Sequence, residues 1–85
     1  MTQDLETRIE QTTLLLAESC AEWGITLAGD RSVSESDAER LLGYGQGTLR
    51  KQREYEVCSI PRRRVGNRWR YRLHDLATVI EREYT

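Results

Sequence analysis

The sequence predicts a mainly α-helical fold with a small β-hairpin, on the basis of three observations. Apolar residues recur at helical spacing near both ends of the chain. Two short helical segments in the middle are joined by a glycine-containing link. After them, aromatic residues alternate with arginines at the period of a β-strand. The 85 residues are enough for one small domain with a modest hydrophobic core.

Composition describes a globular chain, with 38% hydrophobic residues, 32% charged residues and one proline. The longest apolar run, Leu14 to Ala17, falls far short of the ~20 residues of a membrane span. The polar, acidic N-terminus lacks the basic start and apolar middle of a signal peptide. We therefore expect a cytoplasmic protein with no membrane contact.

We expect no catalytic residues, no metal site and no cofactor, and we predict that the protein is not an enzyme. The single histidine, His74, is interpreted as a surface or capping residue. Cys20 and Cys58 are too far apart in sequence for a metal-ligand pair, and two buried thiols are favoured over a disulfide between them. The glycines of residues 43–47 lack the GKS/T ending of a phosphate-binding loop, and paired carboxylates occur only on helix faces expected to be solvated.

Charge is strongly segregated along the chain. Residues 1–30 carry six acidic residues and one arginine, whereas residues 50–72 carry nine basic residues and two glutamates. Twelve of the thirteen basic residues are arginines, whose planar side chains suit phosphates and guanine edges. This segregation predicts a surface that binds a polyanion. A solvated basic surface, or a coding bias toward arginine, is the alternative explanation.

The N-terminal segment is predicted to be an amphipathic helix over residues 5–23. Apolar residues at positions 5, 9, 16, 20 and 23 lie within about 60° of one another on a helical wheel. Leu15 broadens this stripe, Leu14 points to the opposite side, and Gly24 is a C-terminal cap. The helix either packs on the rest of the domain or also presents a surface for self-association or a partner. Residues 25–27 alternate and predict a short extended piece.

The central segment predicts a helix-turn-helix. Ser34 and Asp37 have capping-box spacing at the start of one helix, and Gly43 ends that helix. A tight turn then leads to a second helix over about residues 46–55, whose Leu49 must face the core. The positions that face away from Leu49, together with the start of the helix, give the first candidate DNA-binding residues. These are Gln46, Gly47, Thr48, Arg50 and Lys51.

Each of these candidates has a specific expected contact. Arg50 and Lys51 reach guanine edges or phosphates, and Gln46 is suited to an adenine. Thr48 would meet a phosphate oxygen through its hydroxyl and backbone N–H, and Gly47 would allow close approach of the backbone.

An arginine-rich hairpin, the predicted wing, covers residues 62–72. A two-residue loop at Gly66-Asn67 would mix apolar and cationic side chains on each face. A three-residue loop, 66–68, would pair Val65 with Trp69 and keep the faces separate, so it is the predicted register. The candidate DNA-binding residues here are Arg62, Arg63, Arg64, Asn67, Arg68, Arg70 and Arg72. A last helix is expected from near His74 to about residue 83, with an apolar face of Leu76, Val79 and Ile80.

These features occur in the order of a known family. Leu41-Leu42-Gly43 ends one helix, Thr48-Leu49-Arg50 opens the next, Pro61 precedes the wing of residues 64–72, and Asp75-Leu76 opens the last helix. Residues 34–80 thus resemble the excisionase/MerR-type winged helix-turn-helix. The resemblance implies a winged helix-turn-helix DNA-binding domain over residues 31–85. It is preceded by an extra N-terminal acidic amphipathic helix and connector over residues 1–30, either part of the same compact domain or an oligomerisation element.

The resemblance implies sequence-specific binding of double-stranded DNA. The second helix would enter the major groove, and the wing would contact the phosphate backbone or minor groove. The expected role is that of an excisionase, which directs site-specific recombination, or of a small phage transcription regulator in the nucleoid of a bacterial or phage-infected cell. The alternatives are a DNA-binding protein like the phage terminase small subunit and a protein-interaction adaptor that acts through the acidic helix. Expected protein partners are a second copy of the chain through that helix, and an integrase or other phage protein.

Overall fold

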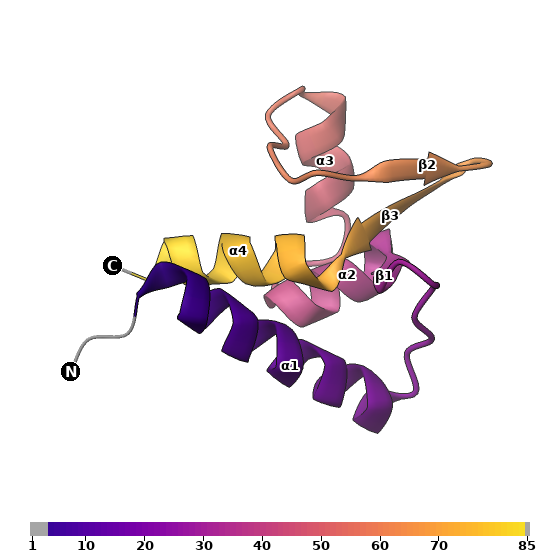
Figure 1. Ribbon diagram of the computed structural model, residues 1–85. Coiled ribbons are helices and arrows are strands. Elements are labelled where there is room, and N and C mark those ends of the chain that lie inside the picture. Colours follow the sequence, from indigo (N-terminus) through magenta and orange to yellow (C-terminus); the bar gives the residue numbers. More distant parts are fainter. Residues whose placement is uncertain (1–3, 85) are drawn as a thin grey trace.

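The computed structural model describes residues 4–84, which form four α-helices and a three-stranded antiparallel sheet (Figure 1). In chain order the elements are α1 (Leu5–Trp23), β1 (Ser32–Ser34), α2 (Glu35–Leu42), α3 (Thr48–Glu54), β2 (Arg63–Val65), β3 (Arg68–Arg72) and α4 (Leu73–Glu83). The prediction of a mainly helical chain with a small β-hairpin is confirmed. Residues 1–3 and 85, at the outer ends of the two predicted segments, lie outside the described residues. Every helix within residues 4–84 is too short or too polar to span a lipid bilayer.

Helix α1 lies along α4 at the base of the molecule, away from α3 (Figure 1). It buries Ile9, Leu16 and Cys20 in the same core that receives the other helices and the sheet. The Thr12 hydroxyl also donates a hydrogen bond of 2.7 Å to the Glu81 carboxylate of α4. The N-terminal helix and residues 31–84 therefore share one core.

The predicted limits of α1 are confirmed, but its apolar stripe is narrower than expected. Gly24 caps the helix in the left-handed conformation, with a φ of 69°, which glycine adopts readily. Leu14 is 67% exposed, as predicted, whereas Leu15 is 59% exposed and does not join the buried face. The prediction for Leu15 was wrong because α4, the main helix packed on α1, covers the strip around Ile9 and Leu16 and leaves Leu15 outside it.

Helix α2 has the predicted limits and local signals. The Ser34 side chain accepts a hydrogen bond from the Asp37 N–H at the start, and Gly43 ends the helix with a φ of 75°. A short link then turns the chain into α3, whose Leu49 is fully buried. The last helix, α4, begins at Leu73, one residue before the predicted start, and buries Leu76.

The sheet has the order β1-β3-β2, and its outer strand β1 was not predicted. Val33 pairs with Tyr71 at the centre of the β1–β3 ladder, and both side chains are fully buried. The extended piece expected at residues 25–27 forms no strand. Ile25 instead turns into the core from the connector that joins α1 to β1. The alternation at residues 25–27 therefore did not produce a strand, whereas β1 forms because it pairs with β3, which is distant in the sequence.

Candidate nucleic-acid interface

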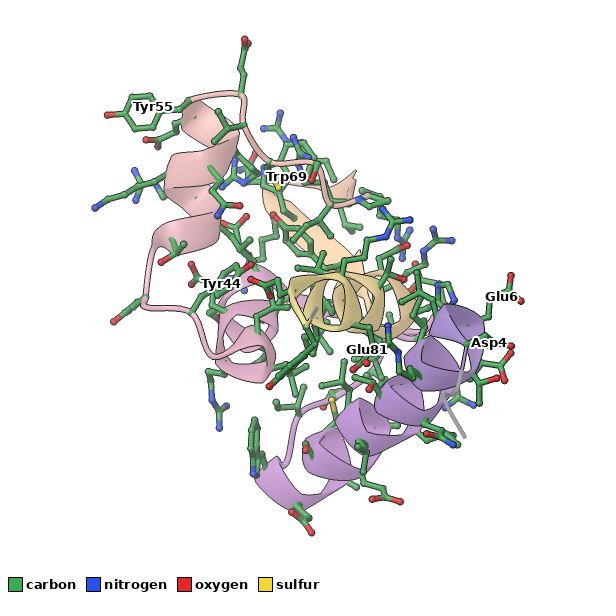
Figure 2. The ribbon with its side chains drawn as sticks, turned by 90° about the vertical axis from the view of Figure 1, so that its left-hand side faces the viewer. Asp4, Glu6, Tyr44, Tyr55, Trp69 and Glu81 are labelled. Carbon is green, nitrogen blue, oxygen red and sulfur yellow. The ribbon has the colours of Figure 1, made fainter. Side chains whose placement is uncertain are left out.

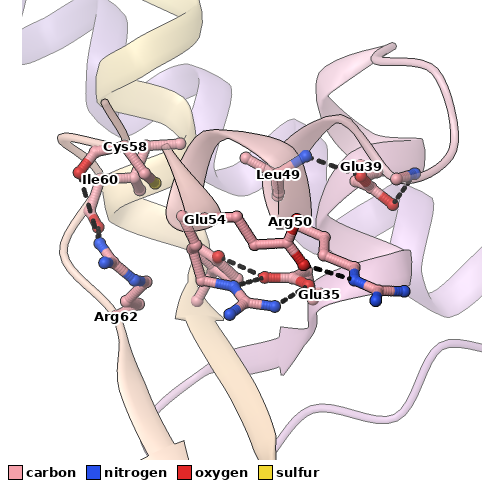
Figure 3. Close-up of polar contacts among 11 residues, drawn as sticks. Glu35, Glu39, Leu49, Arg50, Glu54, Cys58, Ile60 and Arg62 are labelled. Carbon is pink, nitrogen blue, oxygen red and sulfur yellow. Dashed lines mark hydrogen bonds and ion pairs between the residues drawn. The ribbon is translucent and has the colours of Figure 1, made fainter. Parts of the chain in front are cut away.

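The start of α3 is fixed by a buried carboxylate from α2. Glu39 is only 5% exposed, and its two oxygens accept hydrogen bonds from the backbone N–H of Gly47 at 3.2 Å and of Leu49 at 2.8 Å (Figure 3). The Thr48 N–H between them donates to the Gly45 carbonyl at 3.2 Å. These three N–H groups already have partners inside the protein. The Thr48 N–H, expected to meet a phosphate, is occupied by the Gly45 carbonyl in this structure, and the contact expected of the Thr48 hydroxyl stays a prediction.

Helix α3 is shorter than the predicted 46–55. Gly47 precedes it with a φ of 84°, a left-handed conformation that cannot belong to an α-helix, so the helix begins at Thr48. Gln46 is exposed in the turn before it, and Tyr55 lies just beyond its end. The candidate Gln46 is therefore presented by a turn and not by the helix itself.

The face of α3 opposite Leu49 is solvent-exposed and mostly basic. The Arg50 side chain is 71% exposed, and its Nε donates a hydrogen bond of 3.0 Å to Glu54 (Figure 3). Lys51 is exposed as well, and it makes no ion pair with any residue between 4 and 84. Because exposed ion pairs of this spacing contribute only about 0.3–0.5 kcal/mol, Arg50 can leave Glu54 at little cost.

The hairpin of β2 and β3 has a two-residue loop, so the predicted three-residue register was wrong. Val65 pairs with Arg68, Arg64 with Trp69, and Arg63 with Arg70. Gly66 has a φ of 63° and is followed directly by Asn67, which does not adopt positive φ. Glycine at the first central position is typical of a type II′ turn, whose twist matches that of the paired strands.

The register prediction failed because it treated arginine as incompatible with the apolar face. The Arg62 guanidinium lies 5.1 Å from the centre of the Trp69 ring, and the Arg53 guanidinium lies at the same distance. Arginine can stack on an aromatic ring while its stem packs on apolar surface. Val65, which the other register would bury, is instead 46% exposed.

Cross-strand pairs share a face of a sheet, so this register divides the wing arginines between its two faces. We call the face with Trp69 and Tyr71 the inner face, because it packs on the helices. The opposite, outer face carries Arg63, Arg68, Arg70 and Arg72. Arg64 shares the inner face with Trp69 and not the cationic face with Arg70, contrary to prediction.

Several wing arginines are held by partners inside the protein. Arg63 forms an ion pair of 2.9 Å with Asp30, and Arg72 forms one of 2.7 Å with Asp75. Arg70 is half-buried and donates to the Ser32 carbonyl at 2.7 Å and to its hydroxyl at 3.0 Å. Arg70 thus also fastens β3 to β1, and its removal would disturb the sheet as well as the charge.

The tip of the wing presents its exposed polar and basic side chains to solvent. Asn67 and Arg68 are exposed, and Arg68 has no ion-pair partner within the part of the chain that the structure describes. Arg64 is exposed as well and donates to the Gly66 carbonyl at 3.0 Å, which orients it toward the turn. Both arginines can therefore meet an anion without first leaving a carboxylate.

A cluster of polar and aromatic side chains links α2, α3 and the wing; we call it the Glu35 cluster. Glu35 accepts two hydrogen bonds from the Arg53 guanidinium, at 2.6 and 2.9 Å, and one of 2.7 Å from the Tyr71 hydroxyl (Figure 3). Arg53 in turn stacks on Trp69, which lies between α3 and the strands (Figure 2). The cluster fixes the position of the wing relative to α3.

The Glu35 cluster has consequences for protonation. The hydrogen bonds from the Arg53 guanidinium hold the pKa of Glu35 below its ordinary value, with the Tyr71 hydroxyl acting in the same direction. Burial, followed by the hydrogen bond to Glu35, raises the pKa of the Tyr71 phenol far above its ordinary value. At neutral pH the cluster therefore contains a carboxylate, a guanidinium and a neutral phenol.

The stabilising effect of Glu35 is expected to be lost in acid. A carboxyl group whose pKa is lower in the folded than in the unfolded state stabilises the fold above its unfolded pKa, and this contribution disappears as the pH falls through the folded pKa. The difference in unfolding free energy between the wild type and Glu35→Gln should therefore shrink between about pH 5 and pH 3. Urea denaturation across this range measures it.

The matched control for this experiment is Glu22→Gln, which removes an exposed carboxylate from α1. Its difference from the wild type should stay small over the whole range. A wild-type–Glu35→Gln difference that is the same at both ends of the range would contradict an ionised Glu35 held by Arg53.

The structure thus brings the two sets of candidate residues onto one end of the molecule. Figure 1 shows α3 and the hairpin together at the top, with α1 at the bottom. Asp4, the N-cap of α1, and Glu6 in its first turn lie at the opposite side of the view from Tyr55, which follows α3 (Figure 2). The acidic residues of α1 and its N-cap are thus separated in space from the basic residues of α3 and the hairpin, whereas Asp30, also in the acidic segment, pairs with Arg63 of the hairpin.

Sequence reasoning missed three residues that build this interface: Glu35, Glu39 and Arg53. The two glutamates were placed with carboxylates on solvated helix faces, which is wrong for both. One signal was present in the sequence. Arg53 follows Leu49 by four positions and so lies on the same face of α3 as this buried residue.

The histidine and the two cysteines lie outside this surface or make no metal-binding group within the described residues. His74 is exposed, Cys20 and Cys58 are free thiols, and residues 4–84 contain no cluster of side chains able to hold a metal ion. In comparisons with family models, curated proteins and solved structures, nothing matches the chain.

Proposed function

We propose that this protein binds double-stranded DNA, with α3 in the major groove and the hairpin on the adjacent phosphate backbone and minor groove. The observation that carries the proposal is the position of two exposed basic elements at one end of a molecule whose other end is acidic. A major groove is about 12 Å wide and admits one helix. The exposed face of α3 supplies Arg50 and Lys51 to such a groove.

The Glu35 cluster supports the proposal because DNA binding requires the two elements to keep a fixed spacing. The stacked Arg53 and Trp69 side chains join α3 to β3, and Glu35 ties both to α2. A rigid connection lowers the conformational entropy lost on binding. The side chains that would contact DNA are thereby held in place before DNA arrives.

Within this proposal, an excisionase-like or small phage regulatory role agrees best with the order of sequence features in residues 34–80. A terminase-like DNA-binding role uses the same surface. An adaptor role for α1 has one observation in its favour, since Leu14 and Leu15 are both exposed among acidic residues. That role and DNA binding make opposite predictions for affinity toward duplex DNA.

Binding to a duplex of random sequence is expected to depend steeply on salt. Neutralising about five phosphates predicts a slope of roughly −4 to −5 for the logarithm of affinity against the logarithm of salt concentration. Between about 50 and about 200 mM salt, this slope corresponds to a roughly 500-fold loss of affinity. Fluorescence anisotropy of a labelled duplex measures it.

Two single substitutions locate the binding surface in the same assay. Lys51→Ala should flatten the slope by about one unit, whereas Arg82→Ala, on α4, should leave it unchanged. Equal effects of the two substitutions would argue against α3 as the contact surface. Weak binding without a salt slope would reject DNA binding and favour the adaptor role of α1.

A further inference from the structure

The outer face of the sheet contains a pocket that the function proposed above does not by itself require. It is lined by Asp30, Pro61, Arg62, Arg63, Arg70 and Arg72, and we call it the outer arginine pocket. Three of its arginines, Arg63, Arg70 and Arg72, extend from neighbouring positions on the outer face of β2 and β3. These three arginines lie on the side of the hairpin away from Trp69, whereas the Arg62 guanidinium at the edge of the pocket stacks on Trp69.

Contacts inside the protein hold these guanidinium groups in place. Arg70 uses Nε and one terminal nitrogen on Ser32, and Arg72 uses Nε on Asp75. An arginine has five N–H donors, so each of these groups keeps donors for another acceptor. Their orientation is fixed before any ligand arrives, which lowers the cost of binding one.

The only acidic residue among those lining the pocket is Asp30, at the end of the connector from α1. One of its oxygens forms an ion pair of 2.9 Å with Arg63, and the other accepts a hydrogen bond of 3.1 Å from the Ser32 N–H. Asp30 thus faces the three guanidinium groups of the outer face, one of which is also paired with Asp75, while the Arg62 guanidinium stacks on Trp69. Concave sites with such an excess of one charge concentrate counter-ions of the opposite charge.

The shape of a minor groove suggests which anion occupies this pocket. The groove is about 6 Å wide and is bounded by two phosphate backbones. A hairpin that enters it presents one face to each backbone. With α3 in the neighbouring major groove, the inner face of the hairpin meets the backbone between the two grooves, and the outer face meets the backbone beyond.

We propose that the outer arginine pocket binds a phosphate of the DNA strand on the far side of the minor groove, and that Asp30 holds Arg63 in that phosphate's place until DNA binds. The inference rests on the function proposed above. It adds a defined phosphate contact on the outer face of the hairpin and a competing carboxylate from the connector.

The phosphate is identified by pairing protein and DNA substitutions. A duplex is first selected from a randomised pool by the wild-type protein, and its phosphates are then replaced one at a time by neutral methylphosphonates. Each replacement that weakens wild-type binding marks a contact. The one on the far strand should no longer weaken binding by Arg63→Ala, whereas Arg82→Ala should keep every penalty.

The role of Asp30 is tested by Asp30→Asn, which keeps an oxygen for the Ser32 N–H but releases Arg63 from its ion pair. Its affinity for the selected duplex should rise about two- to fivefold, the range expected for an exposed ion pair. The gain should vanish in the Asp30→Asn/Arg63→Ala double variant. Glu22→Gln on α1 removes the same charge from a residue outside the pocket lining and should give a smaller gain that persists without Arg63.

The outcomes separate this inference from the proposed function. If the wild type binds DNA but Arg63→Ala keeps every methylphosphonate penalty, the pocket binds no phosphate and only the further inference fails. If Asp30→Asn and Glu22→Gln gain equally, Asp30 acts through net charge and is no competitor. If the wild type binds no duplex at all, both proposals fail.

Discussion

Replacing Tyr71 by alanine is expected to lower the free energy of unfolding by about 3–5 kcal/mol, the range measured for large aromatic residues in protein cores. Tyr71 is fully buried in β3 and pairs with Val33 at the centre of the β1–β3 ladder. A chain of this length has a total stability of only about 4–13 kcal/mol. The variant should therefore be largely unfolded at moderate urea concentrations, where the wild type is folded.

Tyr71→Phe separates the ring from the hydroxyl in the same measurement. It keeps the buried ring and removes only the hydrogen bond of 2.7 Å to Glu35. The expected loss is about 1.5 kcal/mol, since the acceptor is charged but retains both bonds from Arg53. A loss as large as that of the alanine variant would mean that the hydroxyl, and not the packing of the ring, holds the sheet on the helices.

The matched control for both variants is Tyr55→Ala. Tyr55 is 76% exposed and extends away from the body of the molecule at the end of α3 (Figure 2). Its removal should change stability by less than about 0.5 kcal/mol. A loss below about 1 kcal/mol for Tyr71→Ala would contradict its place at the centre of the core.

Local signals explain why the helices could be predicted from the sequence. Ser34 and Asp37 mark the start of α2, and Gly24 and Gly43 mark the ends of α1 and α2. Each signal depends on a conformation or hydrogen bond within a few residues of the chain. Such features need no knowledge of tertiary structure, so they could be read directly from the sequence.

The strand β1 could not be predicted because its stability comes from elsewhere. It contains three residues, only one of them apolar, and its partner β3 lies more than thirty positions later. Ser32 is fully buried although it is polar, since its hydroxyl and carbonyl both accept from Arg70. The spacing of apolar residues along the sequence contains no information about such a contact between polar groups.

The sequence predicted which elements of the candidate site are basic, but it did not predict the contacts that hold them in place. Counting charged residues located the basic elements, because the net charge of a segment does not depend on the contacts that the segment makes in the folded protein. Such counts could not show that Arg53 is paired with Glu35, or that Glu39 occupies the start of α3. Carboxylates on a helix are interpreted as solvated by default, and only the packed structure reveals which ones are enclosed.

The second large effect concerns sequence recognition: Arg50→Ala should reduce discrimination at one base pair of the selected duplex by about 1–3 kcal/mol, or roughly 5- to 150-fold. Arg50 is exposed on α3, and its ion pair with Glu54 uses only Nε. The two terminal nitrogens are directed to no other side chain of residues 4–84, so they are free for the paired acceptors of a guanine.

The measurement compares binding of Arg50→Ala and wild type to the selected duplex, to its single-base variants and to random duplex. Arg50→Ala should bind random duplex with a modest uniform loss and fail to distinguish one position that the wild type requires. Arg68→Ala, at the tip of the wing, should weaken all duplexes alike, since a phosphate contact carries no sequence information. Glu54→Gln should leave the sequence preference intact, because it only releases Arg50 from its partner.

Equal losses on selected and random duplex for Arg50→Ala would remove this residue from base recognition. Sequence preference would then have to come from other residues of the surface or from the deformability of the DNA.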